Sequence, residues 1–261
     1  MHRLPHVQRE DVILPEDTLK LLDRNVIDFA ANRAKLRAIG QPSKKGLLFY
    51  GPPGTGKTHT IQYLASCLED HTTLLVTAEQ VASMREYFGL ARLLQPALLV
   101  IEDADLIARD REELGSALQE ALLNKLLNEM DGLRQDADIF FVLTTNRPEH
   151  LEAALADRPG RIDQAIEFPL PDEVGRAKLV QLYAGNLSIP RTVLDTTVQR
   201  TENVSPAFIK ELMRRVAQYV FERQDAANEA TQDDIHAALD EMLFAGGRLN
   251  ARLLGGPENA E

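Results

Sequence analysis

The chain has 261 residues, of which 44% are hydrophobic and 26% are charged, and its formal net charge is -11 at pH 7. That length suits one large domain, or one domain with a small companion, and it is ample for a hydrophobic core. The acidic balance argues against binding to nucleic acid or to an anionic membrane surface. A single cysteine, Cys67, excludes an internal disulfide, and no apolar stretch reaches the roughly 18 residues needed to span a bilayer. We therefore expect a cytoplasmic protein with neither a nucleic-acid nor a membrane partner.

Strands and helices alternate over the first two thirds of the chain. Residues 1–22 are expected to form an N-terminal extension, and residues 23–170 a large domain. Apolar strands are predicted at Gly46–Tyr50, Thr73–Thr77, Ala97–Ile101, Ile139–Thr145 and Gln164–Phe168, with helices near Lys57–Leu68, Met84–Leu94 and Leu114–Met130. Cys67 shares the first helix pattern with Ile61 and Leu64, which predicts a place in the core. Short apolar strands bracketed by helices predict an α/β fold with a parallel sheet covered on both faces.

The character of the chain changes after the stretch PLPD at residues 169–172, because only helical patterns follow. Ser205 is predicted to cap a helix that has Pro206 at its first position. Thr231 is predicted to open another helix, with acids in the first turn. We expect a small helical lid domain over residues 171–250 and a C-terminal tail over residues 251–261.

The stretch GPPGTGKT, residues 51–58, directly follows the first predicted strand and opens the next helix. It fits GxxxxGK[ST] in the strand–loop–helix context of a phosphate-binding loop, in which backbone N–H groups surround phosphate oxygens. Lys57 is predicted to reach the β- and γ-phosphates, and the Thr58 hydroxyl to bind Mg²⁺. A chance glycine-rich turn is the alternative, but the lysine, the threonine and both flanking elements are in place. The predicted nucleotide-binding residues are Gly51, Pro52, Pro53, Gly54, Thr55, Gly56, Lys57, Thr58 and His59.

The stretch ALLVIEDAD, residues 97–105, is an apolar strand that ends in three acids. In a P-loop protein such acids hold Mg²⁺ and activate the attacking water, which makes Thr58, Glu102 and Asp103 the predicted metal ligands. The more familiar order of the pair is Asp-Glu. If Glu102 takes the position of the usual Asp and Asp103 that of the usual Glu, Glu102 binds in the coordination shell of Mg²⁺ and Asp103 polarises the attacking water. The reverse assignment stays open. Capping of the next helix is the alternative role for these acids, and we expect it for Asp105.

The phosphate-binding loop, the acidic strand, TTNRP at residues 144–148 and RPGRID at residues 158–163 occur in this order. Together they resemble the AAA family, the ATPases associated with diverse cellular activities, as a single ATPase module. The resemblance extends from about Asp23 to Met242. It implies ATP and Mg²⁺ as ligands, ATP hydrolysis, a five-stranded sheet of order 5-1-4-3-2, a helical lid and a ring of six subunits.

The same resemblance suggests roles for single residues. Asn146 is similar to the polar sensor that orients the attacking water, and Arg158 and Arg161 are similar to arginine fingers that act on the neighbouring subunit's nucleotide. A surface salt bridge is the alternative for these arginines. The stretch MDGL at residues 130–133 resembles the family's inter-subunit signalling turn. The predicted catalytic residues are Lys57, Glu102, Asp103, Asn146, Arg158 and Arg161.

The sequence departs from the family pattern in three places. The stretch LEAALADRPGR, residues 151–161, is one residue longer than the common form before its first arginine, Arg158. The inverted pair Glu102-Asp103 is shared with the Rieske-protein translocases of mitochondria, so it is compatible with activity. The stretch TAEQVAS at residues 77–83 stands where threading members have an aromatic pore loop, and it has no aromatic residue. The nearby YFG at residues 87–89 lies within a helix pattern, which favours core packing over a pore role.

Two functions are compatible with these features. The first is an ATP-hydrolysing ring motor that remodels or disassembles a protein client without an aromatic grip in its first pore loop. The second is a nucleotide-controlled assembly or chaperone-like binding protein with slow ATP turnover. The acidic balance disfavours a third, a loader or initiator that acts on nucleic acid. The expected partners are identical subunits, in a hexamer, and a protein client that the sequence does not name.

Overall fold

The computed structural model describes residues 5–77, 80, 83–105, 125–134, 136–149, 151, 160–223 and 228–245. The chain divides into two compact units. The first comprises Met1–Arg9, Glu16–Gly51 and Lys57–Phe168, and the second comprises Glu10–Pro15, Pro52–Gly56 and Pro169–Glu261. The domain limits expected from the sequence, after residues 22, 170 and 250, stay predictions.

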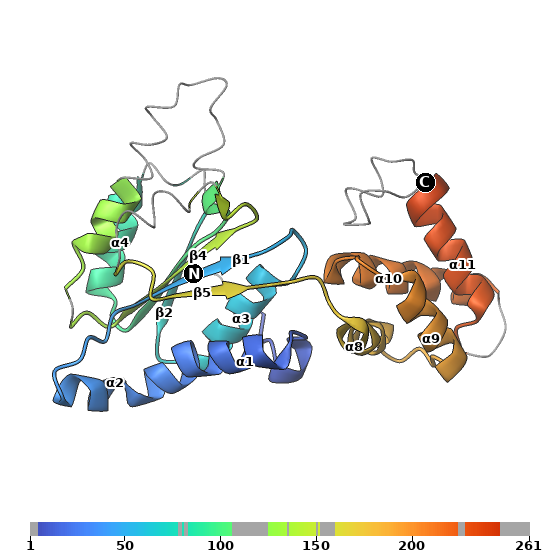
Figure 1. Cartoon of the computed structure of the whole chain (residues 1–261), viewed down its shortest axis with the longest axis horizontal. Coiled ribbons are helices and arrows are strands. Elements are labelled where there is room, and N and C mark those ends of the chain that lie inside the picture. Colours follow the sequence, from blue (N-terminus) through green and yellow to red (C-terminus); the bar gives the residue numbers. More distant parts are fainter. Residues whose placement is uncertain are drawn as a thin grey trace, which may run out of the picture. The chain divides into compact units, whose positions relative to one another are not determined.

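The first unit is built on one five-stranded parallel sheet (Figure 1). Its strands are β1 (Lys45–Tyr50), β2 (Thr72–Val76), β3 (Ala97–Ile101), β4 (Ile139–Thr145) and β5 (Gln164–Glu167). Their order across the sheet is β2-β3-β4-β1-β5, which confirms the predicted α/β fold and strand order. Every residue of β3 and β4 is buried, as is usual where helices cover both faces of a parallel sheet.

The register of the central strands brings their carboxyl ends to one edge of the sheet. Tyr50 of β1 pairs with Thr145 of β4, and Ile101 of β3 pairs with Leu143 of β4. The residues that follow these three strands therefore leave the sheet side by side. In open α/β sheets this is the edge where ligands bind.

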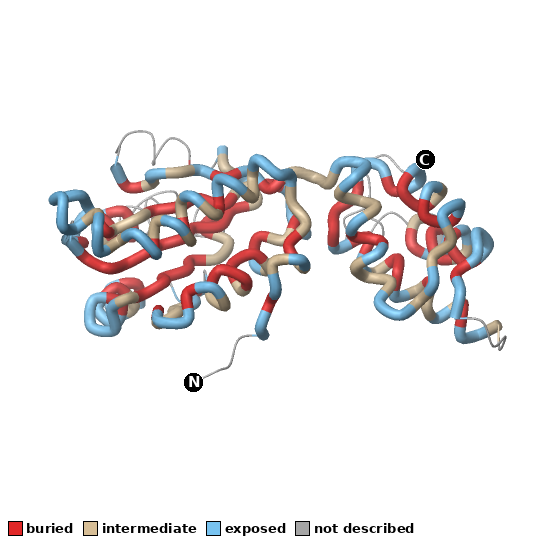
Figure 2. Tube along the Cα trace, turned by 90° about the horizontal axis from the view of Figure 1, so that it is seen from below, coloured by how far each residue is buried: buried red, intermediate tan, exposed pale blue. Residues whose placement is uncertain are grey.

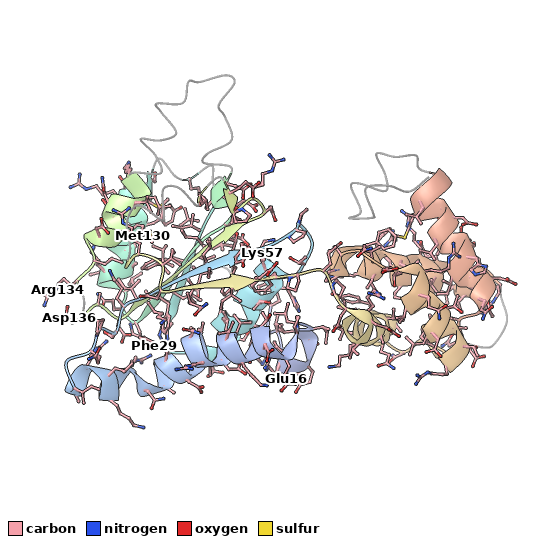
Figure 3. The ribbon with its side chains drawn as sticks, viewed as in Figure 1. Glu16, Phe29, Lys57, Met130, Arg134 and Asp136 are labelled. Carbon is pink, nitrogen blue, oxygen red and sulfur yellow. The ribbon has the colours of Figure 1, made fainter. Side chains whose placement is uncertain are left out.

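Helices lie on both faces of the sheet (Figures 1 and 3). The named helices of this unit are α1 (Glu16–Leu22), a π-helical turn η2 (Asp23–Ile27), α2 (Asp28–Ala38), α3 (Lys57–Cys67) and α4 (Met84–Leu93), and a short 3₁₀ helix η1 (Arg9–Asp11) spans the boundary between the two units in the sequence. Phe29 of α2 meets Phe140 of β4 edge to face, with ring centroids 5.7 Å apart. The next residue, Phe141, packs in a cluster with Phe88 of α4. Because successive strand residues point to opposite faces, α2 and α4 cover opposite sides of the sheet.

Two core predictions have different outcomes. Phe88 is fully buried and Tyr87 packs against the same cluster, which confirms the core packing predicted for the stretch YFG. Cys67, in contrast, is exposed, so its predicted place in the core was wrong. It is the last residue of α3, and its direction from the helix axis falls between those of buried Thr60 and Tyr63, so its exposure goes with its place at the end of the helix and not with its helix face.

The second unit contains the C-terminal helices α8 (Glu173–Ala184), α9 (Arg191–Arg200), α10 (Pro206–Glu222) and α11 (Gln232–Asp240) and the π-helical turn η4 (Glu241–Ala245). Both predicted caps are confirmed. Ser205 Oγ accepts a hydrogen bond from the backbone N–H of Phe208 at 3.2 Å, and Thr231 forms a capping box with Asp234. Buried residues of these helices form one core, to which α10 contributes more than any other helix. Figure 2 colours the buried residues of the chain red.

Among the described residues, no helix combines the length and the apolarity that crossing a membrane requires.

Candidate active site

The loop GPPGTGKT connects β1 to α3 and depends on its glycines. Gly51 has φ +143°, and a Cβ built on it would lie 2.2 Å from the carbonyl oxygen of Phe168. Only glycine fits so close to another backbone. Gly54 and Gly56 also have positive φ angles, of +76° and +95°. The chain can therefore wrap tightly here, as a phosphate-binding loop must.

Two hydrogen bonds hold the part of this loop that belongs to the second unit. The Thr55 hydroxyl donates to the Pro52 carbonyl oxygen at 2.8 Å, and the backbone N–H of Ala207 donates to the Gly54 carbonyl oxygen at 3.2 Å. Pro52, Pro53 and Gly54 are exposed, and His59 on α3 is half-buried. The loop is thus fixed by its own turn and by the start of α10.

Lys57 begins α3 at the carboxyl-terminal edge of the sheet (Figure 3). Its ammonium donates to the Gly51 carbonyl oxygen at 2.7 Å, and the residue is only 7% exposed. Burial lowers the pKa of Lys57 to about 8, although the negative charges of Asp103 and Asp105 act in the opposite direction. The ammonium is therefore a poorly hydrated cation, which an incoming phosphate anion would stabilise.

Glu102 is the first residue after β3, and its side chain contacts the start of α3. Its backbone N–H donates to the Val76 carbonyl oxygen at 2.9 Å, which extends the pairing of β2 with β3 by one step. The Thr58 hydroxyl donates to Glu102 Oε1 at 2.5 Å. Hydroxyl and carboxylate oxygens suit Mg²⁺, which usually shares such ligands with phosphate oxygens and water. Thr58 and Glu102 therefore fit this ion.

Asp103 has different partners, although it is the next residue. It has φ +50°, a conformation that few residues other than glycine adopt. Its backbone N–H donates to Thr144 Oγ1 at 2.9 Å, and its Oδ1 accepts a hydrogen bond from Asn146 Nδ2 at 3.1 Å. The unusual backbone angle thus separates the two carboxylates. Glu102 meets α3, and Asp103 meets the end of β4.

Sequence reasoning missed the contacts of Asp105. This residue is 3% exposed, and its Oδ1 accepts hydrogen bonds from Thr145 Oγ1 at 2.9 Å and from the backbone N–H of Asn146 at 3.1 Å. Its expected role as a helix cap is not tested, because residues 106–124 lie outside the described part. The close spacing of three acids was the available signal, but spacing alone does not show which neighbour each acid meets.

The structure describes only one of the two predicted arginine fingers. Arg158 lies outside the described residues. Arg161 is 3% exposed, and its guanidinium forms a two-point ion pair with Asp131, in which Nε donates to Oδ1 at 2.7 Å and Nη2 donates to Oδ2. Asp131 follows Met130 in the stretch MDGL, so two motifs that are distant in sequence meet here. The role of Arg161 as a finger stays a prediction.

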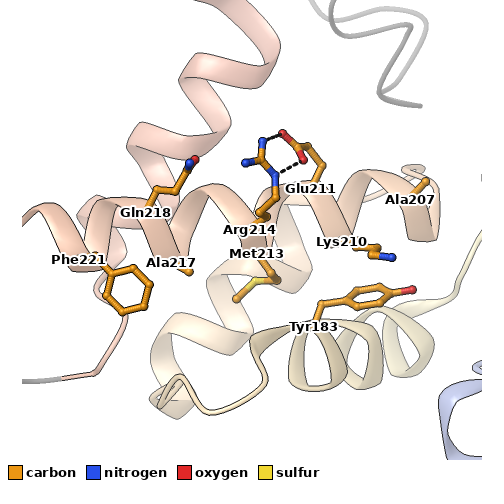
Figure 4. A pocket seen from close by; sticks show the side chains of 9 residues that line it. All are labelled: Tyr183, Ala207, Lys210, Glu211, Met213, Arg214, Ala217, Gln218 and Phe221. Atoms are coloured by element: carbon orange, nitrogen blue, oxygen red, sulfur yellow. Dashed lines mark hydrogen bonds and ion pairs between the residues drawn. The ribbon is translucent and has the colours of Figure 1, made fainter.

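A groove within the second unit lies between α8 and α10 (Figure 4). Its cavity volume is about 550 Å³, and exposed Phe221 forms part of its lining. The Lys210 ammonium lies 5.8 Å from the centre of the Tyr183 ring, and Arg214 pairs with Glu211 beside it. None of the predicted site residues lines this groove.

The sequence matches a known family over the part that carries these groups. Residues 47–170 fit the model described as the ATPase family associated with various cellular activities (AAA). That segment runs from β1 through the phosphate-binding loop, the acidic strand end, Asn146 and Arg161. The chain is an AAA-family ATPase. The activity of this AAA ATPase is the hydrolysis of ATP.

Curated relatives of this AAA ATPase match most of the chain. It is 31% identical over 247 residues to the ATP-dependent zinc metalloprotease FTSH 1, chloroplastic, of Arabidopsis thaliana. This alignment covers 90% of this chain and 34% of the relative. It is 32% identical over 254 residues to the ATP-dependent zinc metalloprotease FtsH 1 of Methylacidiphilum infernorum, covering 93% and 39%. It is 37% identical over 161 residues to the 26S proteasome regulatory subunit 10B of Dictyostelium discoideum, covering 58% and 41%. The chain thus spans well under half the length of these relatives.

The described residues of the AAA chain hold no group of three or more His, Cys, Asp or Glu side chains placed to bind a metal ion. Such a group is not what a nucleotide-bound Mg²⁺ requires, because that ion takes one or two side-chain oxygens and completes its shell with phosphate and water. The contact between Thr58 and Glu102 is of the latter kind.

The lowered pKa of Lys57 predicts that affinity for Mg·ATP falls at alkaline pH. Below its pKa of about 8 the ammonium carries the charge that attracts phosphate, and above that pH the free protein loses this charge. The dissociation constant should be nearly constant below this pH and should rise above it towards about tenfold per pH unit, with protons taken up on binding. Titration calorimetry in two buffers of different ionisation enthalpy measures both effects.

Lys57→Arg is the matched control, because a guanidinium stays charged over this pH range. Whatever its absolute affinity for Mg·ATP, that affinity should not vary with pH above 8. An affinity of the natural protein that stays constant through the same alkaline range would contradict the part assigned to Lys57.

Proposed function

We propose that this AAA ATPase is a ring motor that uses ATP hydrolysis to remodel or disassemble a protein client. The observation that carries the proposal is that Glu102 and Asp103, although adjacent in sequence, contact different elements. Glu102 contacts Thr58 of α3, whereas Asp103 contacts Asn146 at the end of β4. Two carboxylates with different partners suit one metal ligand and one base for the attacking water.

Each group then has one chemical task. When bound, Mg²⁺ would supply positive charge at the β- and γ-phosphates, held by the Thr58 hydroxyl and the Glu102 carboxylate. Lys57 donates hydrogen bonds to the same phosphates. Asp103 accepts a proton from the attacking water, and the Asn146 amide orients that water against the carboxylate. Binding and water activation are thus carried by different residues, so substitutions can separate them.

The names of the relatives support a protein client. They describe ATP-dependent metalloproteases and a regulatory subunit of the 26S proteasome, and a protease acts on protein. The net charge of -11 speaks against nucleic acid as the alternative client. We propose a cytoplasmic hexamer, in which each nucleotide would lie next to a neighbouring subunit.

The aspartate at the base position favours slow turnover. An aspartate is one methylene shorter than a glutamate, so its carboxylate reaches less far from the backbone towards the water. Slow turnover also suits the second candidate, a nucleotide-controlled assembly or chaperone-like binder. Turnover that rises with protein concentration, and again with a protein client, supports the motor. Tight ATP-dependent assembly with negligible turnover supports the binder.

The separation of tasks predicts different defects for two isosteric variants. Asp103→Asn should lower kcat by about 10²–10⁴-fold while Mg·ATP binding stays intact, because only the base is lost. Glu102→Gln should instead raise the Mg²⁺ concentration needed for activity, and excess Mg²⁺ should restore part of the rate. Steady-state turnover across a Mg²⁺ titration, with binding of a fluorescent ATP measured in parallel, distinguishes the two.

The opposite pattern would reverse the assignment. Full turnover of Asp103→Asn, together with a Glu102→Gln variant that binds ATP normally but stays inactive at every Mg²⁺ concentration, would make Glu102 the base. A natural protein that assembles with ATP but never turns it over would rule out the motor.

We further propose that Arg161 leaves Asp131 in the assembled ring and acts on the neighbouring subunit's nucleotide. Arg161→Ala should then bind ATP normally but hydrolyse it poorly, since arginine fingers contribute about 10³–10⁵-fold in other NTPases. Mixing it with Lys57→Ala subunits should restore part of the activity. At a mixed junction, the intact loop of one subunit meets the intact arginine of the other.

Asp131→Ala is the matched control, because it breaks the same ion pair but keeps the guanidinium. It should retain more turnover than Arg161→Ala. Equal losses in the two variants, or mixtures that co-assemble yet stay as inactive as their parents, would show that the ion pair matters for the fold rather than for hydrolysis in trans.

A further inference from the structure

Asp105 is a buried carboxylate whose role the loop and the acidic pair do not explain. It is 3% exposed, and within the described residues it forms no ion pair. Burial of a carboxylate without a cation is unfavourable unless hydrogen bonds replace its water. Its Oδ1 accepts two such bonds, from Thr145 Oγ1 at 2.9 Å and from the Asn146 backbone N–H at 3.1 Å. Both donors lie at the end of β4.

These bonds fix the chain on both sides of Asn146. The Thr145 hydroxyl gives its only proton to Asp105 and accepts a hydrogen bond from the backbone N–H of Arg147 at 2.9 Å. The Asn146 N–H is itself bound to Asp105. The Asp105 carboxylate therefore holds the backbone on both sides of Asn146. It binds the Asn146 N–H directly, and it is linked to the Arg147 N–H through the Thr145 hydroxyl. The Asn146 side chain is left to donate to Asp103 Oδ1 at 3.1 Å.

We propose that Asp105 is a positioning residue for ATP hydrolysis, which acts through Thr145 and Asn146 to aim the Asn146 amide at Asp103 and the attacking water. The inference rests on the proposed role of Asp103 as the base. Misplacement of a reacting group by about 1 Å can lower a rate by about 10²-fold. A carboxylate that touches neither nucleotide nor water can thus set the rate of turnover.

A purely structural role for Asp105 leads to a different expectation. If this carboxylate only joined β3 to β4, its loss would destabilise the protein and reduce activity whether or not the Asn146 amide is present. A positioning role depends on that amide, because the amide is what Asp105 places. Removal of the Asn146 side chain should then abolish the kinetic effect of changing Asp105, since residues that act as one unit are strongly non-additive.

The experiment compares kcat and KM for ATP at saturating Mg²⁺ in the natural protein, Asp105→Ala, Asn146→Ala and the double variant. Asp105→Ala should lower kcat by about 10²-fold and change KM by no more than about threefold. In the Asn146→Ala background, Asp105→Ala should cause no further loss of kcat. Asp105→Asn keeps an oxygen that can accept both hydrogen bonds, so it should recover most of the rate that Asp105→Ala loses.

Two threonine variants provide a matched control. Thr145 and Thr197 are both buried, and each hydroxyl donates one hydrogen bond, from Thr145 to Asp105 at 2.9 Å and from Thr197 to the Val193 carbonyl oxygen of its own helix at 2.7 Å. Thr145→Val should lower kcat, and that loss should also vanish in the Asn146→Ala background. Thr197→Val should leave kcat unchanged.

The inference is overturned if Asp105→Ala lowers kcat by the same factor in both backgrounds, leaves kcat unchanged, or raises KM alone. If Asp105→Ala does not fold, the same comparison with Thr145→Val decides. If the natural protein is active and Asp103→Asn inactivates it, but substitutions at Asp105 and Thr145 leave kcat unchanged, this inference alone is refuted. A fully active Asp103→Asn variant would refute the proposed function itself.

Discussion

The parallel pairing of β3 with β4 is the constraint on which the active site depends. Because Ile101 lies opposite Leu143, residues 102–105 and residues 144–147 leave the sheet beside each other. Four hydrogen bonds then join the two strand ends, two from backbone N–H groups and two from side chains. A slip of one residue in this pairing would turn each strand side chain to the opposite face. The buried faces of β3 and β4 prevent that slip, so the core sets the geometry of the acids.

The site combines an unusual backbone conformation with buried charges. Asp103 adopts a positive φ, at a cost of about 1–3 kcal/mol for a strained residue. Lys57 is buried enough to lower its pKa to about 8, and Asp105 is buried without an ion pair among the described residues. These features lie together at the edge where β1, β3 and β4 end. Bound phosphate would place a negative charge beside Lys57, and it would thereby offset the cost of burying the Lys57 ammonium.

The sequence predicted the strands, the phosphate-binding loop and the caps at Ser205 and Thr231 because each has a local signal, whereas the sheet order was implied only by the resemblance to the AAA family. Apolar strands of five residues, a glycine-rich loop before a helix, and a capping residue can all be recognised within a short window. It failed for Cys67 because that residue shares the direction of buried Thr60 and Tyr63 but ends the helix, and spacing along a helix does not show where the neighbours that cover it stop.

The contacts of Asp105 and Arg161 could not be predicted for a different reason. Each joins segments that are distant in sequence, Asp105 to Thr145 and Arg161 to Asp131. Periodicity and spacing report on one segment at a time, whereas these pairs follow from the sheet order and from the side to which each chain turns. The motif showed which residues belong to the site. The fold shows which of them hold one another.

A crystal structure with Mg²⁺ and a non-hydrolysable ATP analogue tests the central claim most directly. We predict that Thr58 and Glu102 lie in the coordination shell of the metal. Asp103 and Asn146 should both contact the water that faces the γ-phosphate. A metal bound by Asp103, with Glu102 turned to that water, would contradict the division of tasks between the two acids.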